Sequence, residues 1–174
     1  MKEIFERRSI RNYTGEMISD EELSLILKAG YAAPIGRGKY EDMAITVITN
    51  KELLNEINET GKAFFRNPEM NPLYDAPCLI LVSSKLSGRP VDNIPYSNGA
   101  CVVENMALMA TKLGIGSCHI WGATIAVSHV NELIAKLGLP EDYTPMCGII
   151  LGKTNEVYSE REVADNRIAT NFIK

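Results

Sequence analysis

One stretch of the chain, Cys78–Ser84, reads Cys-Leu-Ile-Leu-Val-Ser-Ser and is apolar at successive positions. A strand with one face in water alternates apolar and polar residues, whereas a strand covered on both faces is apolar throughout. This segment therefore predicts a central β-strand with further layers on both sides. Apolar and β-branched residues predict two more strands at Ala44–Thr49 and Thr144–Leu151, and a short one at Ser117–Trp121.

Helical signals lie between these strands. Ser19, followed three residues later by Glu22, has the pattern of a capping box and predicts a helix that runs to about Ala32. Asn50 is predicted to cap the next helix, which ends at Gly61. Ser128 is predicted to cap a late helix whose core face contains Val130, Leu133, Ile134 and Leu137.

A longer helix is predicted for Ser97–Leu113, with Gly114 as its terminator. Its apolar residues surround the axis almost completely, so it is expected to be buried on most sides by the rest of the fold or by a partner chain. We interpret Lys62–Asp75 as mainly loop and Lys85–Pro95 as a polar, mobile segment.

Alternating helices and strands predict an α/β or α+β fold, a sheet with helices on its faces. No repeat or linker divides the chain, so residues 1–174 are taken as one domain. The charged tail beyond Gly152 ends in Ile168, Phe172 and Ile173 without an apolar period of its own. We therefore expect the tail to dock elsewhere, for example on a second subunit.

Charge and cysteine content exclude several classes of protein. A formal charge of −4 disfavours nucleic-acid binding, and the absence of a signal peptide or long apolar run predicts a cytoplasmic protein. Only two histidines make a zinc site improbable. The four cysteines lie among apolar neighbours and are interpreted as buried, reduced thiols: Cys78, Cys101, Cys118 and Cys147.

Three segments could carry chemistry. Arg7-Arg8-Ser9-Ile10-Arg11 offers planar guanidinium groups that match phosphate oxygens; the alternative is a solvated basic patch after a short N-terminal helix. The loop Pro34-Ile35-Gly36 could bring backbone amides to a ligand, or simply connect two elements. In the third segment, Gly114–Gly122, His119 is interpreted as a core residue and Trp121 could also be one. No nucleophile context favours a triad hydrolase.

The order of these motifs resembles the FMN-dependent nitroreductase family over nearly the whole chain. The resemblance rests on the early Arg-Arg-Ser-x-Arg, a helix ending in Ala33-Pro34-x-Gly36, a buried helix closing with Leu113-Gly-Ile-Gly-Ser, then Trp-Gly and a final Gly-Ile-Ile-Leu-Gly strand. It implies a three-layer α+β fold with a central mixed sheet flanked by helices. It also implies a homodimer with FMN at the subunit interface and a C-terminal arm that crosses to the partner.

The same resemblance implies the residues that hold the cofactor. Arg7, Arg8, Ser9 and Arg11 would bind the phosphate and ribityl chain of FMN, and Arg161, or else Arg167, would also reach the phosphate. Pro34, Ile35 and Gly36 would lie along the ring of the other subunit's flavin, and Ile120, Trp121 and Gly122 at the pyrimidine edge of the ring. No catalytic side chain is implied.

The resemblance also implies that the protein is an oxidoreductase. It would pass hydride from NADH or NADPH through flavin N5 to a nitroaromatic, quinone or similar small acceptor. One segment departs from the family pattern. Gly38-Lys39-Tyr40-Glu41-Asp42 stands where family members commonly have an Asn and then Gln-Pro-Trp. This departure keeps open a flavin-binding carrier or sensor with little turnover, and a specialised reaction such as reductive dehalogenation or flavin fragmentation.

Overall fold

The computed structural model describes residues 2–86 and 93–174. Its sheet has the strand order β1-β2-β4-β3 and contains β1 (Met43–Ile48), β2 (Cys78–Lys85), β3 (Gly116–Ile120) and β4 (Tyr143–Gly152). The prediction that Cys78–Ser84 forms a central strand is confirmed, because β2 has neighbours on both sides.

The sheet is antiparallel in all three pairings, so the expectation of a mixed sheet is wrong for the strands that the structure describes. The register explains the first pairing. Ile48, the last residue of β1, lies opposite Leu79 near the start of β2. The chain therefore enters β2 at the end of the sheet where β1 finishes, after a helix and a loop of several turns, 65–77.

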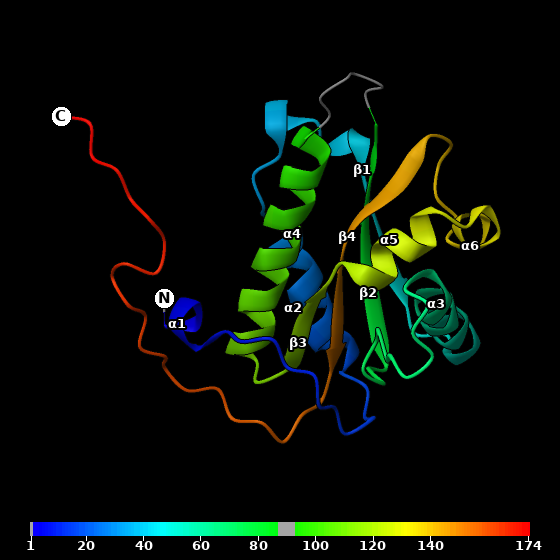
Figure 1. Cartoon of the computed structure of the whole chain (residues 1–174), viewed down its shortest axis with the longest axis horizontal. Coiled ribbons are helices and arrows are strands. Elements are labelled where there is room, and N and C mark those ends of the chain that lie inside the picture. Colours follow the sequence, from blue (N-terminus) through cyan, green and yellow to red (C-terminus); the bar gives the residue numbers. More distant parts are fainter. Residues whose placement is uncertain (1, 87–92) are drawn as a thin grey trace.

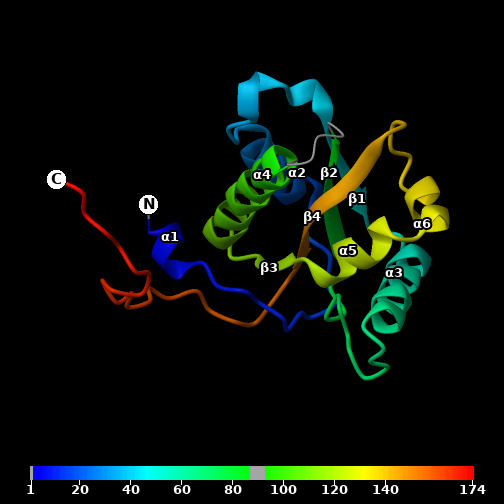
Figure 2. The ribbon, with the colours of Figure 1, turned by 45° about the horizontal axis from the view of Figure 1, so that its top comes forward.

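Helices cover both faces of the sheet and give three layers (Figures 1 and 2). Cys78, Ile80 and Val82 of β2 belong to the core beneath α2 (Asp20–Tyr31) and α4 (Asn93–Lys112). Leu79 and Leu81 point the opposite way, as alternate residues of a strand must, toward the layer formed by α3 (Lys51–Phe64), α5 (Gly122–Ser128) and α6 (Asn131–Lys136). The short α1 (Glu3–Glu6) lies beside α4. The predicted three-layer α+β architecture is confirmed.

The helix caps expected at Ser19 and Asn50 are present. The Ser19 hydroxyl accepts the Glu22 N–H at 3.2 Å, and the Glu22 carboxylate accepts the Ser19 N–H at 2.8 Å. The Asn50 side-chain oxygen accepts the Leu53 N–H at 2.9 Å. Gly114 ends the long helix as predicted, with a left-handed φ of 71° that a glycine adopts without strain.

Two predicted helix boundaries are wrong. Gly61 does not end α3, which continues to Phe64. A Cβ at Gly61 would lie 2.7 Å from the Pro72 side chain, so the glycine allows close packing of the following loop. Ser128 does not cap α6 but ends α5, where its hydroxyl donates to the Ile125 carbonyl at 2.8 Å. The N-cap position of α6 is Val130, which makes no side-chain cap bond.

The helix α4 begins at Asn93, earlier than predicted, and one of its faces remains uncovered. Val103, Met106 and Ala110 are buried against the sheet, whereas Tyr96 and Cys101 are exposed. The partner chain invoked for this helix is therefore not needed for its inner face. The predicted mobile segment Lys85–Pro95 falls mainly on residues 87–92, which lie outside the described residues.

The C-terminal tail, residues 153–174, forms neither helix nor strand and runs past α1 and away from the body (Figure 1). Phe172 and Ile173 are almost wholly exposed. The described residues contain no helix with the length and apolarity needed to span a membrane. All four cysteines are free, and Cys78 and Cys118 are buried as predicted. The prediction of a buried thiol is wrong for Cys101, which is exposed on the surface of α4, and for Cys147, which is half-buried where the burial pattern of β4 is interrupted.

Candidate functional site

The arginine-rich segment is held against the edge strand β3 by the residue at its centre. Ile10 is fully buried, and its N–H donates to the Ser117 carbonyl at 2.8 Å. The Tyr13 hydroxyl donates to the Ile10 carbonyl at 2.7 Å and fixes the turn that follows. With Ile10 anchored, Ser9 and Arg11 on either side are exposed. The buried Ile10 side chain therefore anchors the segment, while the polar side chains of Ser9 and Arg11 face the solvent.

Arg7 is engaged by a carboxylate that the sequence did not single out. Its Nε lies 3.0 Å from Glu104 Oε1, and His119 Nε2 lies 3.3 Å from Glu104 Oε2. The hydrogen bond from His119, and then the charge of Arg7, hold the pKa of Glu104 below its usual value. Glu104 is the only acidic residue in α4, and a single carboxylate on an otherwise apolar helix is the sequence feature that could have indicated its role.

His119 is not a core residue, so that interpretation is wrong, and the alternative of a core position for Trp121 is excluded as well. Strand β3 lies at the sheet edge, and Cys118 and Ile120 take its two neighbouring inward positions. His119 is therefore turned outward to Glu104, with a side-chain exposure of 42%. Trp121 follows the strand at the start of α5 and is 64% exposed.

Arg8 has an unfilled donor. Its Nη2 donates to Ser159 Oγ at 2.8 Å, but its Nε is buried without a hydrogen-bond partner among the described residues. A buried guanidinium N–H that lacks an acceptor is costly, and a phosphate oxygen is an acceptor that matches it. The donor set of this segment therefore fits an anionic group.

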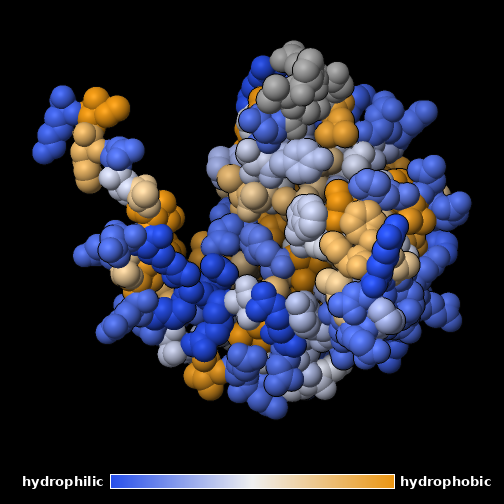
Figure 3. Space-filling view, in the orientation of Figure 1, coloured by the Kyte–Doolittle hydropathy of each residue, from blue (hydrophilic) through white to orange (hydrophobic). Residues whose placement is uncertain are grey.

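The tail brings a further arginine to the same place. The backbone N–H and the Nε of Arg161 both donate to the Phe5 carbonyl at 3.1 Å. Arg161 therefore lies beside the N-terminal segment, as does Ser159. The alternative, Arg167, is exposed and makes no hydrogen bond or ion pair with that segment among the described residues. In Figure 3, strongly hydrophilic side chains occupy the region where the tail and the N-terminal segment adjoin.

A pocket joins the arginine segment to the Trp-Gly motif. Arg11 lines it together with Ile120, Trp121 and Gly122, and we call it the Trp121 pocket. Its volume is about 110 Å³. The remaining wall is formed by Met70, Pro72, Tyr74, Cys118, His119 and Ala123. The Arg11 guanidinium lies 5.6 Å from the centre of the Tyr74 ring, which steadies an otherwise exposed cation.

The loop Pro34–Gly36 is not brought to this pocket within one chain. It lies at the end of α4 where that helix begins, far from the N-terminal segment in both views (Figures 1 and 2). The Gly36 N–H donates to Asn98 Oδ1 at 2.9 Å, and a Cβ at Gly36 would lie 2.9 Å from Ile94. Pro34 and Gly36 are exposed and Ile35 is half-buried, so the loop presents a free surface.

Comparison with protein families gives a match to the nitroreductase family over residues 4–69 and 56–153. A relative from Archaeoglobus fulgidus, whose predicted activity is NADH dehydrogenase/NAD(P)H nitroreductase, is 33% identical over 153 residues, 87% of this chain and 83% of its own length. The NADPH-flavin oxidoreductase of Vibrio harveyi is 27% identical over 88% of this chain, which spans 65% of that protein.

Solved structures of similar shape include two with a bound cofactor. A nitroreductase with bound FMN from Desulfitobacterium hafniense has a TM-score of 0.84 and 27% identity, covering 99% of this chain and 97% of its own. A nitroreductase with bound FMN from Bacteroides fragilis has a TM-score of 0.81 and 29% identity, with 98% and 97% covered.

Proposed function

Because this chain belongs to the nitroreductase family, we propose that it is an FMN-dependent NAD(P)H oxidoreductase that reduces a nitroaromatic, quinone or similar small acceptor. The observation that carries the proposal is the Trp121 pocket, which Arg11 lines together with Ile120, Trp121 and Gly122. Ser159 and Arg161 of the tail are hydrogen-bonded to the N-terminal segment that carries Arg8 and Arg11. A phosphate-binding end and a ring-binding end therefore lie next to each other.

We assign the phosphate to Arg8, Ser9 and Arg11. The free Nε–H of Arg8 and the exposed guanidinium of Arg11 supply charged donors, and the Ser9 hydroxyl is exposed between them. Arg161 and Arg7 complete the set. Arg7 is less available than the others because Glu104 already binds it at 3.0 Å. Glu104 instead keeps the Arg7 side chain in place beside the site.

We assign the flavin ring edge to Ile120, Trp121 and Gly122. Gly122 lets the Phe65 ring pack closely against the start of α5, since a Cβ there would lie 3.1 Å from that ring. Backbone N–H groups at the start of α5 can stabilise negative charge on a bound ring. When bound, FMN would supply the redox chemistry, the transfer of hydride from NADH or NADPH through N5 to the acceptor. These residues position the ring; no side chain is assigned an acid–base role.

We further propose that the active form is a homodimer with FMN at the subunit interface. A pocket of about 110 Å³ is well below the roughly 300–1,000 Å³ of ordinary small-molecule sites, so one chain supplies only part of the wall. The loop Pro34–Gly36, remote from the pocket in its own chain, would face the flavin held by the other subunit. The exposed tail, with Phe172 and Ile173, would be the arm that crosses to the partner.

Two features of the proposal come from the sequence alone. Residues 1–174 act as one FMN-binding domain in a cytoplasmic protein. The alternative function, a flavin carrier or sensor with little turnover, is favoured by one observation: Gly38–Asp42 replaces the Asn and Gln-Pro-Trp that family members commonly have.

Anaerobic mixing of the FMN-loaded protein with NADH or NADPH separates the two functions. The enzyme should lose its flavin absorbance near 450 nm ~10²-fold faster than free FMN does, and regain it when menadione or nitrofurazone is added, because catalytic positioning contributes such factors. Flavin that stays bound but is reduced no faster than free FMN would reject the enzyme and support the carrier.

A further inference from the structure

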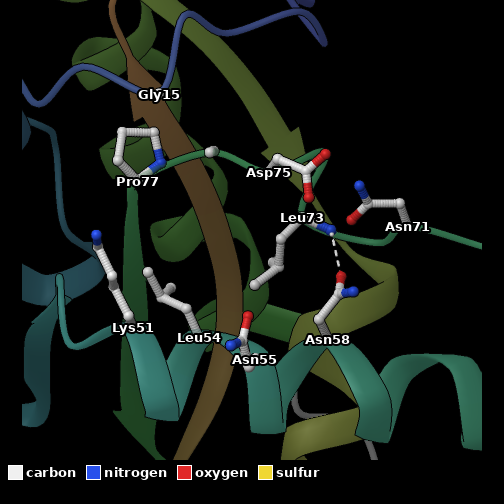
Figure 4. Close-up of a pocket in the computed structure, with 10 residues that line it drawn as sticks. Gly15, Lys51, Leu54, Asn55, Asn58, Asn71, Leu73, Asp75 and Pro77 are labelled. Atoms are coloured by element: carbon white, nitrogen blue, oxygen red, sulfur yellow. Dashed lines mark hydrogen bonds between the residues drawn. The ribbon is translucent and has the colours of Figure 1, made fainter.

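A second pocket lies between α3 and the segment that leads into β2 (Figure 4). Its volume is about 320 Å³, at the small end of the usual range for small-molecule sites. The floor is apolar and contains Leu54, Leu73, Ala76 and Pro77. The polar lining consists of Lys51, Asn55, Asn58, Asn71 and Asp75, with the backbone of Gly15. We call this space the Asn71 pocket.

The wall of this pocket has an unfilled acceptor. Asn71 Oδ1 is buried without a hydrogen-bond partner among the described residues, whereas neighbouring Asn58 Oδ1 accepts the Leu73 N–H at 3.1 Å. A buried acceptor without a donor is costly. Asn71 lines the pocket, and the last torsion of an Asn side chain is broad, so its amide can turn to meet a ligand there. A ligand that carries an N–H donor would satisfy it.

The charges at the rim point to the rest of that ligand. Within residues 2–86 and 93–174, neither Lys51 nor Asp75 has an ion-pair partner. Figure 4 draws Lys51 on one side of the pocket and Asp75 with Asn71 on the other, with Leu54 and Leu73 between them. An ammonium group suits Asp75 and Asn71, a carboxylate suits Lys51, and an apolar body suits the floor.

The Asn71 pocket shares a wall with the Trp121 pocket. Asn71, Leu73 and Asp75 line the first, and the alternating residues Met70, Pro72 and Tyr74 line the second. The wall is also unusual in its backbone. Tyr74 and Asp75 have φ values of 53° and 58°, a left-handed conformation that non-glycine residues rarely adopt in succession. A ligand on one side therefore contacts a strained segment whose other side faces the proposed flavin site.

We propose that the Asn71 pocket binds a small zwitterion of amino-acid size, and that its occupancy changes the affinity for FMN through segment 70–75. The first half is independent of the proposed function. The second half rests on it.

The first experiment is calorimetric titration of the purified protein with each of the twenty free amino acids. We expect saturable binding of one or more at one site per chain. The deaminated acid and the decarboxylated amine of the tightest binder should each bind at least tenfold more weakly, because each lacks one charged end. A flat titration with every amino acid, or equal binding of the truncated compounds, would overturn the site.

Variants then locate the binding. Asp75→Asn and Asn71→Leu should each weaken it roughly ten- to hundredfold, the effect of losing a hydrogen bond to a charged group. Asn tolerates the left-handed backbone at position 75, so the first variant is readable even if the second fails to fold. Glu52→Gln removes an exposed charge from α3, the helix that carries Lys51, at a position outside the pocket. This variant should bind the amino acid as the wild type does. Binding that Asp75→Asn leaves unchanged contradicts the assignment.

The coupling is read from FMN titrations with and without the saturating amino acid, followed by flavin fluorescence. We expect at least a threefold change in the FMN dissociation constant, with the reciprocal change in amino-acid affinity. An unchanged constant would overturn the coupling while leaving the site. A protein that binds the amino acid but no FMN would instead reject the proposed function.

Discussion

Replacing Arg11 by Ala removes a charged donor from the proposed phosphate site and leaves the fold nearly untouched. A hydrogen bond to a charged group contributes roughly 1.5–3 kcal/mol, so the FMN dissociation constant should rise roughly ten- to hundredfold. Arg11→Lys keeps the charge without the planar fork and should fall between the wild type and Arg11→Ala. Fluorescence titration of the flavin-free protein measures all three affinities.

The structural cost of the same change is small. Arg11 is exposed, its side chain makes no hydrogen bond or ion pair among the described residues, and its guanidinium lies 5.6 Å from the centre of the Tyr74 ring. An exposed cation–π contact contributes about 0.5–1 kcal/mol, so the free energy of unfolding of the flavin-free protein should fall by no more than that. Lys28→Ala, which removes an exposed cation from α2, is the matched control for the loss of one positive charge.

The two readouts make the reasoning refutable. FMN affinity within twofold of the wild type in Arg11→Ala, with Lys28→Ala also unchanged, would show that the phosphate is held elsewhere. A loss of affinity accompanied by several kcal/mol of lost stability would show that Arg11 acts on the fold and not on the ligand.

Three further predictions concern the fold and the assembly. Glu22→Gln should cost about 1 kcal/mol at pH 7 by losing the ion pair to Lys153 at 2.6 Å. Lys153 and Ser19 lower the pKa of Glu22 in the folded state, so the difference in unfolding free energy between wild type and variant should be full above pH ~4.5. It should disappear as the pH falls through the folded-state pKa. A difference in urea unfolding that stays constant down to pH 2 contradicts this. Gly148→Ala places a Cβ 2.6 Å from the Thr124 hydroxyl, so thermal unfolding should reveal a loss of about 1–3 kcal/mol, and wild-type stability would refute the packing. Dilution should release monomers and FMN together in sedimentation runs that monitor flavin absorbance, whereas a monomer that retains FMN would disprove the shared site.

The sequence predicts those elements whose signals are local. The capping box at Ser19 and the cap at Asn50 depend on side chains within three residues, and both helices begin where those residues place them. Cys78–Ser84 is apolar throughout because both faces are covered, so its central place in the sheet is also encoded locally.

The errors arise where tertiary contacts decide. Helix α5 (Gly122–Ser128) contains three β-branched residues and no side-chain cap, so its own sequence does not favour a helix. Burial of Ala123, Ala126 and Val127 stabilises it instead. Gly61 likewise has the appearance of a helix terminator, although it is required inside α3 by the approach of Pro72.

The site shows the same division. The arginine motif could be recognised from its residues, but the sequence does not reveal that Glu104 engages Arg7 and His119, since these residues are distant along the chain. The outward direction of His119 and Trp121 follows from the place of β3 at the sheet edge. That place is set by pairing with β4, which no local pattern specifies.

The most direct test of the central claim is the absorption spectrum of the purified protein, with mass identification of whatever heat releases. The account predicts flavin bands, or their appearance when FMN is added to a colourless sample, and a released molecule with the mass of FMN. A colourless protein that takes up no added FMN would contradict the assignment of Arg8, Arg11 and the Trp121 pocket to flavin.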